Sequence, residues 1–179
     1  MASELPAPLA ALRDALPDFA RDLRINLGNV LDSANLTPQQ VWGTAVASAI
    51  ACRNPRLREA VSAAAAPHLS PAAAAAARMA AALMGMNNVY YRFTELVGKE
   101  EYRRLPARLR MQGIANPGIE KADFELFSLA VSAVNGCGMC VAAHERQLAQ
   151  AGVKPESVQD AVRIAAVLHG VATALEAGS

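Results

Sequence analysis

The stretch ADFELFSLAVSAVNGCGMCVAAHE, residues Ala122–Glu145, is the most informative part of the chain. Its first half is mostly apolar, and the pair Asn135-Gly136 then interrupts it. Such a pair can adopt positive φ and form a turn. We therefore expect two helices, over about 121–135 and 137–151, that meet at this turn.

The second of these helices is expected to begin with a pair of cysteines. Cys137 stands at its start, where free backbone N–H groups and the helix dipole favour an anion and lower the pKa of a thiol. Cys140 follows three residues later and His144 four residues after that, so the three side chains share one helix face. A disulfide between the cysteines and a proton exchange between Cys140 and His144 are both geometrically reasonable.

A polar stripe runs along the first helix, formed by Glu125, Ser128, Ser132 and Asn135. With an antiparallel turn, Glu125 lies about 15 Å back along its helix and His144 about 10 Å along the next, because each residue rises 1.5 Å. We expect Glu125 to contact His144 directly or through a bridging water.

Other roles for the cysteine pair are weaker. Cys137, Cys140 and His144 could be three ligands of a structural zinc site that Cys52 or His169 completes, but classical sites separate their ligand pairs by about a dozen residues or more. Covalent haem attachment needs a histidine directly after the second cysteine, where this chain has Val141. A structural disulfide is disfavoured in a reducing compartment. We expect Cys52 to be a small buried hydrophobe and His169 a core histidine.

Composition favours an all-α fold. The chain has 179 residues, of which 53% are hydrophobic and only 4% aromatic, and alanine is abundant. Close-packed helices suit this composition better than strands do. One domain over residues 1–179 is expected, with the redox segment at about 121–151.

Three N-cap residues precede a proline, at Thr37-Pro38, Asn54-Pro55 and Ser70-Pro71, which is typical of helix starts. The remaining helices are expected over about 8–25, 38–53, 55–66, 71–97 and 155–177, with an irregular connection around 113–118.

Charge and hydropathy exclude several partners. Lys and Arg number 17 against 16 Asp and Glu, which gives a net charge of +1 and no general attraction to nucleic acid or anionic membranes. Residues 1–6 lack a basic segment followed by an apolar one, and polar residues interrupt each apolar stretch before the roughly 18 residues that span a bilayer. We expect a cytoplasmic protein with no membrane or nucleic-acid partner.

A weak internal repeat occurs at an offset of 85 residues, where 78–85 matches 163–170 at five of eight positions. Chance matching in an alanine-rich chain is the alternative to duplication. A real duplication would confine the chemistry to the second copy, because the first has other residues at three matching positions: Gln40 for Glu125, Pro55 for Cys140 and Glu59 for His144.

Taken together, Glu125 and the motif Ser-Ala-Val-Asn-Gly-Cys137-x-x-Cys140-x-x-x-His144-Glu145 resemble the alkylhydroperoxidase D (AhpD) family of the carboxymuconolactone decarboxylase-like superfamily. The resemblance covers nearly the whole chain. It implies an AhpD-like helical bundle that forms a homotrimer, a weak hydroperoxide reductase activity, and the ability to reduce the peroxiredoxin AhpC. It also implies electrons from dihydrolipoamide on a lipoyl-bearing 2-oxoacid dehydrogenase component, with no metal and no tightly bound cofactor.

By the same resemblance, Glu125, Cys137, Cys140 and His144 match the catalytic positions, and the two cysteines form the redox disulfide. Glu125 would orient His144, which would take the proton from Cys140. The Cys140 thiolate would attack the peroxide and Cys137 would resolve the product. The helix-start argument favours Cys137 as the lower-pKa thiol, so the order of attack stays open. The family pattern has a histidine where this chain has Met139, which puts any relay step through that histidine in doubt.

Three alternative functions remain. The protein could serve only as a disulfide reductant for a peroxiredoxin, it could be a lyase like the decarboxylases of the superfamily, or it could be a zinc-responsive or redox-sensing module. Only the lyase would work without the cysteine pair.

Overall fold

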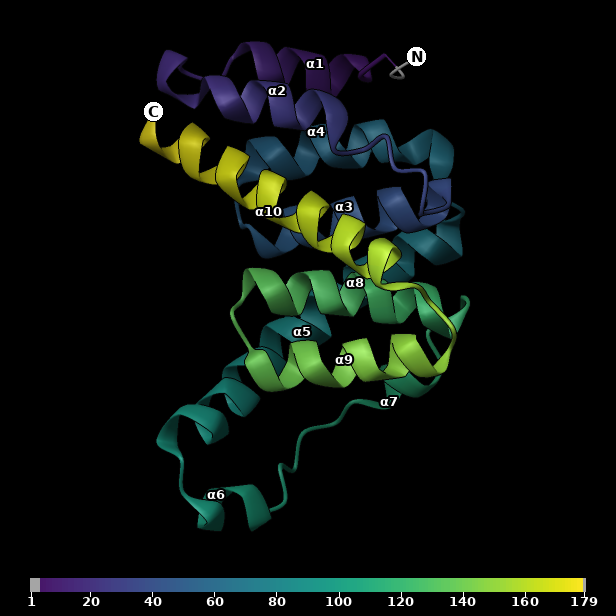
Figure 1. Cartoon of the computed structure of the whole chain (residues 1–179), viewed down its shortest axis with the longest axis vertical. Coiled ribbons are helices and arrows are strands. Elements are labelled where there is room, and N and C mark those ends of the chain that lie inside the picture. Colours follow the sequence, from purple (N-terminus) through teal and green to yellow (C-terminus); the bar gives the residue numbers. More distant parts are fainter. Residues whose placement is uncertain (1–3, 179) are drawn as a thin grey trace.

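The computed structural model describes residues 4–178, so the first half of the N-terminal segment inspected for a leader lies outside it. Over this range the secondary structure is entirely helical, which confirms the all-α expectation (Figure 1). The α-helices are α1 Ala7–Asp14, α2 Arg21–Asn29, α3 Pro38–Ala51, α4 Pro55–Ala65, α5 Pro71–Val97, α6 Glu100–Arg104, α7 Gln112–Ala115, α8 Lys121–Val134, α9 Gly138–Gln150 and α10 Pro155–Ala177.

The expected single helix over about 8–25 is wrong. The chain forms α1, a 3-10 turn at Asp18–Ala20 and then α2. Pro17 causes the break, because proline lacks a backbone N–H and disfavours helical geometry at the preceding residue.

The three predicted N-caps are confirmed. The Thr37 and Ser70 hydroxyls accept hydrogen bonds from the backbone N–H groups of Gln40 at 3.2 Å and Ala73 at 3.1 Å. Asn54 Oδ1 accepts from the Leu57 N–H at 2.8 Å. These side chains satisfy N–H groups that a helix start otherwise leaves unpaired, which places the starts of α3, α4 and α5 as expected.

The helix order supports the internal repeat. Helices α8, α9 and α10 each begin within two residues of the position that an offset of 85 from α3, α4 and α5 gives. The central helices α3 and α8 pack closely because Gly43 lies under the Phe127 ring, where an added Cβ would collide with it. Both residues are buried.

Helix α10 crosses α3 and α8 and buries Ile164 and Leu168 in the core (Figure 1). Within the described residues it is the one helix long and apolar enough, on length and composition alone, to cross a membrane. Of its most apolar stretch, 44% is buried against the rest of the protein.

One part of the chain projects from the body. Helix α5 runs past the other helices and ends at Gly98, whose φ of +65° is the left-handed conformation that glycine favours. Residues 98–111, here called the arm, carry α6 and return along an irregular path to α7 (Figure 1). The connection expected around 113–118 to be irregular therefore contains one short helix.

Candidate functional site

The start of α9 holds the cysteine pair as expected. Cys137 is the N-cap, and its Sγ accepts a hydrogen bond from the Cys140 backbone N–H at 3.4 Å. The two residues are joined by a disulfide, with their Cα atoms 5.3 Å apart. Gly136, at a φ of +66°, makes the sharp turn from α8 that brings the pair to this position.

Glu125 and His144 contact each other directly. His144 Nδ1 lies 2.6 Å from Glu125 Oε2, and the side chains are only 11% and 6% exposed. His144 Nε2 faces the sulfur of Met84 at 3.1 Å. A carboxylate on Nδ1 holds the proton there and leaves the lone pair on Nε2, which can then accept a proton.

A cavity of about 300 Å³ opens beside these groups. Its wall is mostly apolar and is formed by Met84, Asn87, Tyr91, Met111, Ile114, Met139, Cys140, Ala143 and His144. Cys137 is fully buried and borders a separate depression, so Cys140 is the cysteine that faces the cavity. Asn87 Oδ1 is buried there without a hydrogen-bond partner among the described residues.

The polar stripe on α8 meets polar residues of α5. Asn88 Nδ2 donates to Ser132 Oγ at 3.0 Å, and Asn135 Nδ2 donates to Asn88 Oδ1 at 2.9 Å. Ser128 Oγ is buried without a partner in the described part of the chain. Sequence reasoning missed the α5 residues, although the doublet Asn87-Asn88 inside an apolar helix is a visible signal.

Glu95 of α5 also reaches the cysteine pair. Its Oε2 accepts a hydrogen bond from the Met139 N–H at 3.3 Å, in the first turn of α9. A Cβ at Gly138 would lie 2.9 Å from Glu95 Oε1, so the glycine makes room for the carboxylate. Met139, at the position where the resemblance implies a histidine, is 39% exposed. Its sulfur accepts from Thr94 Oγ1 at 3.8 Å.

The structure also tests the burial expected for His169 and Cys52, and neither residue is fully buried. His169 is exposed, not a core residue, because it lies on the solvent side of α10. Cys52 is half-buried, and burial raises the pKa of its thiol to about 11.

The residues needed for the zinc alternative are not brought together. Cys52 and His169 line a separate hollow, away from His144. Within residues 4–178 no three His, Cys, Asp or Glu side chains form a group that could hold a metal.

The first copy of the repeat has no equivalent chemistry. Gln40 closes the capping box with Thr37 and donates to Asp123 Oδ1 at 2.8 Å. Glu59 is exposed and Pro55 begins α4. Gln40 and Pro55 therefore have structural roles here, and Glu59 is a surface residue.

Comparisons with known proteins show which family the chain resembles. The model of the carboxymuconolactone decarboxylase family matches residues 100–178, which include the whole second copy of the repeat. A Rhodospirillum centenum protein named alkyl hydroperoxide reductase AhpD is 57% identical over 169 residues, covering 94% of this chain and 91% of the relative. Proteins of the same name from Bradyrhizobium sp. and Frankia alni are also 57% identical, with coverage of 94% of this chain and 93% and 91% of their own.

Proposed function

Because the chain belongs to the AhpD family, within the carboxymuconolactone decarboxylase superfamily, we propose that it is an alkyl hydroperoxide reductase that works through Cys137 and Cys140. One observation carries the proposal: Cys140 and the Glu125-paired His144 line one apolar cavity, while Cys137 lies directly behind Cys140. An apolar cavity suits the alkyl group of an organic hydroperoxide.

In the reduced protein, His144 acts as the base. Glu125 holds Nδ1 in the protonated form, and Nε2 takes the proton from the Cys140 thiol. Within residues 4–178, Nε2 has one polar contact, with the Met84 sulfur, a weak acceptor that does not compete for this role. Cys140 attacks first because it faces the cavity, whereas Cys137 is enclosed.

The thiolate attacks the distal peroxide oxygen and the O–O bond breaks. The leaving alkoxide takes the proton from His144 and departs as alcohol, while Cys140 becomes a sulfenic acid. The Cys137 thiol then attacks the Cys140 sulfur and releases water, which forms the disulfide. Two electrons from the two thiols thus reduce one peroxide. Asn87 lines the cavity and its Oδ1 has no hydrogen-bond partner among the described residues, so we assign to it the acceptance of a hydrogen bond from the O–H of the hydroperoxide.

A dithiol then reduces the disulfide by exchange. We assign this role to dihydrolipoamide on a lipoyl-bearing 2-oxoacid dehydrogenase component, and we assign to the reduced pair the regeneration of the peroxiredoxin AhpC, both in the cytoplasm. The proposal needs no metal and no tightly bound cofactor, because all electrons pass through sulfur.

Self-association as a homotrimer is part of the proposal. Phe93 and Leu96 lie on one face of α5 and are 50% and 78% exposed, and Leu105 of the arm is 59% exposed. Exposed apolar side chains gathered on a projecting segment are typical of an interface.

Intact-mass alkylation tests the cycle. One equivalent of cumene hydroperoxide should remove two alkylatable thiols, and dihydrolipoamide should restore them, while Cys52 stays constant. In Cys137→Ser, Cys140 should accumulate as a sulfenic acid that dimedone traps, whereas Cys140→Ser should give no trapped product. If both thiols stay reduced with peroxide but oxidised AhpC consumes them, the protein is a disulfide reductant only. Enzymatic activity that survives in the double variant Cys137→Ser and Cys140→Ser would instead indicate a lyase.

A further inference from the structure

A second hollow lies on a different face of α5 from the cavity of the cysteine pair. Its volume is about 320 Å³. Three basic side chains, Arg53, Arg92 and His169, line it, and no acidic side chain does so among the described residues. The other lining residues are Ala51, Cys52, Gly85, Asn88, Val89, Val134 and Asn135. The proposed reaction uses none of the basic groups.

Arg53 has an unusual backbone. Its φ is +61°, in the left-handed region that side chains other than glycine and asparagine rarely adopt. Glycine would occupy this position between α3 and α4 without strain. A strained arginine on the wall of a hollow points to a function for its side chain.

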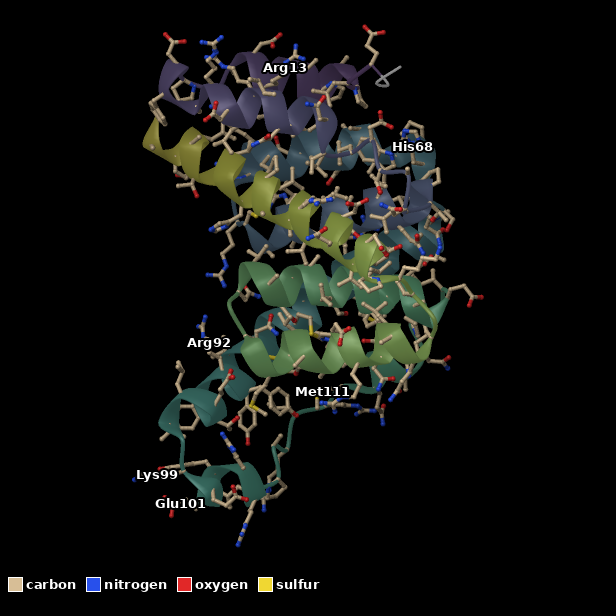
Figure 2. All side chains as sticks on the ribbon, in the orientation of Figure 1. Arg13, His68, Arg92, Lys99, Glu101 and Met111 are labelled. Atoms are coloured by element: carbon tan, nitrogen blue, oxygen red, sulfur yellow. A yellow bond between two sulfur atoms is a disulfide. The ribbon has the colours of Figure 1, made fainter. Side chains whose placement is uncertain are left out.

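Arg92, the second arginine of the hollow, lies on α5 and is held in place by a hydrogen bond. Its Nη1 donates to the Asn135 backbone oxygen at 2.6 Å, which anchors it beside the turn between α8 and α9 (Figure 2). A guanidinium has five N–H donors, and this bond uses one of them. Neither Arg92 nor Arg53 forms an ion pair with another described residue.

Gly85 keeps the hollow open. It lies in the middle of α5, where glycine is less favourable than alanine. No atom lies within 4 Å of the position of an added Cβ, so packing does not require the glycine. Its lack of a side chain leaves space in the hollow that it lines.

We propose that this hollow binds a small oxyanion, a phosphate or carboxylate group, between Arg53 and Arg92. The planar forks of two arginines match the paired oxygens of such groups. The His169 imidazole and the Asn88 amide border the same space. The site is independent of peroxide chemistry, so its failure and that of the proposed reaction are separate results.

The test is titration of the full chain with inorganic phosphate and, separately, with succinate, at constant ionic strength, followed by amide and arginine side-chain NMR shifts. The wild type is expected to show saturable shifts at Gly85 and Asn135. Arg53→Gly, which relieves the backbone strain, and Arg92→Gln should each weaken binding about tenfold, the loss expected for one charge-assisted hydrogen bond. Gly85→Leu fills the space without changing charge and should abolish binding. The tighter of the two ligands identifies the oxyanion class.

Arg78→Gln is the matched control, because it removes one charge from an exposed position on the same helix. If Arg78→Gln weakened binding as much as Arg53→Gly and Arg92→Gln do, the shifts would reflect only the overall charge of the protein, and the proposal would be overturned. Binding that survives Gly85→Leu would also overturn it. The proposal would also be overturned if the wild type showed no saturation and the Arg53→Gly and Arg92→Gln variants no longer assembled. The hollow would then be a contact between copies of the chain.

Discussion

At the scale of single residues, Glu95 places a negative charge at the N-terminal end of α9, where a thiolate of the cysteine pair would form. The helix dipole favours a thiolate there and the carboxylate opposes it. We expect Glu95→Gln to stabilise the reduced pair and to make the disulfide up to about tenfold easier to reduce at low ionic strength, which corresponds to one unit in a thiol pKa.

Equilibration with a dithiothreitol redox buffer measures this shift, and added salt should shrink it. Glu101→Gln, an exposed change on the arm, is the control and should leave the equilibrium constant unaltered. Equal behaviour of the two variants would remove Glu95 from the redox chemistry.

Asn87 is expected to orient the hydroperoxide. Asn87→Leu removes the unpartnered Oδ1 and should lower kcat/KM for peroxide about tenfold, the effect of one lost hydrogen bond. The rate of disulfide reduction by dihydrolipoamide should not change. Tyr91→Phe, on the same wall, serves as the control in stopped-flow measurements of both half-reactions. A parallel loss in both half-reactions would contradict the role.

The sequence alone predicted the central residues of the site but not their neighbours. Cys137, Cys140 and His144 follow from spacing on one helix, and Glu125 follows from the turn that joins it to the next. Asn87 and Glu95 come from α5, more than forty residues away in sequence. Only tertiary packing places them beside the cysteines.

At the scale of helices, Gly43 sets how closely α3 and α8 approach. Gly43→Ala would drive a Cβ into the Phe127 ring, and both residues are buried. We expect a loss of about 1–3 kcal/mol in the free energy of unfolding, as for other overpacked cores. Gly28→Ala in α2 has open space at its Cβ and should raise stability by up to about 1 kcal/mol. Urea denaturation of both variants checks the contrast, and equal effects would refute it.

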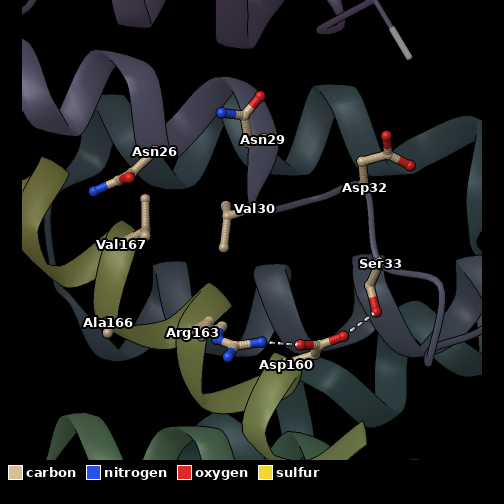
Figure 3. A pocket seen from close by; sticks show the side chains of 9 residues that line it. All are labelled: Asn26, Asn29, Val30, Asp32, Ser33, Asp160, Arg163, Ala166 and Val167. Carbon is tan, nitrogen blue, oxygen red and sulfur yellow. Dashed lines mark hydrogen bonds and ion pairs between the residues drawn. The ribbon is translucent and has the colours of Figure 1, made fainter. Parts of the chain in front are cut away.

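Asp160 ties α10 to the loop between α2 and α3. It accepts hydrogen bonds from Ser33 at 2.6 Å and from Arg163 at 2.7 Å (Figure 3). The Asn35 side-chain amide donates to it as well, at 2.9 Å. Burial alone would raise the pKa of the carboxyl, but these bonds and the Arg163 charge outweigh it and lower the pKa below its ordinary 3.8. A lowered pKa stabilises the fold above the unfolded value, and this stability is lost as pH falls through the folded value.

Asp160→Asn should therefore cost about 1–2 kcal/mol near pH 7, the usual worth of hydrogen bonds to a charged group. The difference from the wild type should shrink below about pH 4. Urea denaturation at several pH values checks this, with Asp14→Asn as the exposed control. A difference that stays constant down to pH 2 would contradict the linkage.

Helix starts were predictable where a cap and a proline coincide, because the signal is local. Pro17 is an equally local signal for a helix break, but the prediction of one helix over 8–25 did not take it into account. The arm could not be predicted, since neither periodicity nor a cap marks residues 98–111.

At the scale of the whole molecule, the exposed face of α5 bears on assembly. Leu96→Glu places a charge on a side chain that is 78% exposed, so the subunit should fold normally while the proposed homotrimer dissociates. Ile25→Glu, which is 56% exposed on α2, is the control and should stay assembled. Sedimentation velocity distinguishes the two states. An intact trimer in Leu96→Glu would exclude this face from the interface.

The return path of the arm supplies part of the cavity wall, because Met111 and Ile114 lie where the chain rejoins the body. A partner that binds the arm would therefore contact a segment that continues into that wall. Under the proposed function, peroxide entry and subunit contact would therefore both depend on this one stretch of backbone. A compound that binds between the arm and the body of the protein would then be expected to inhibit it without contacting either sulfur.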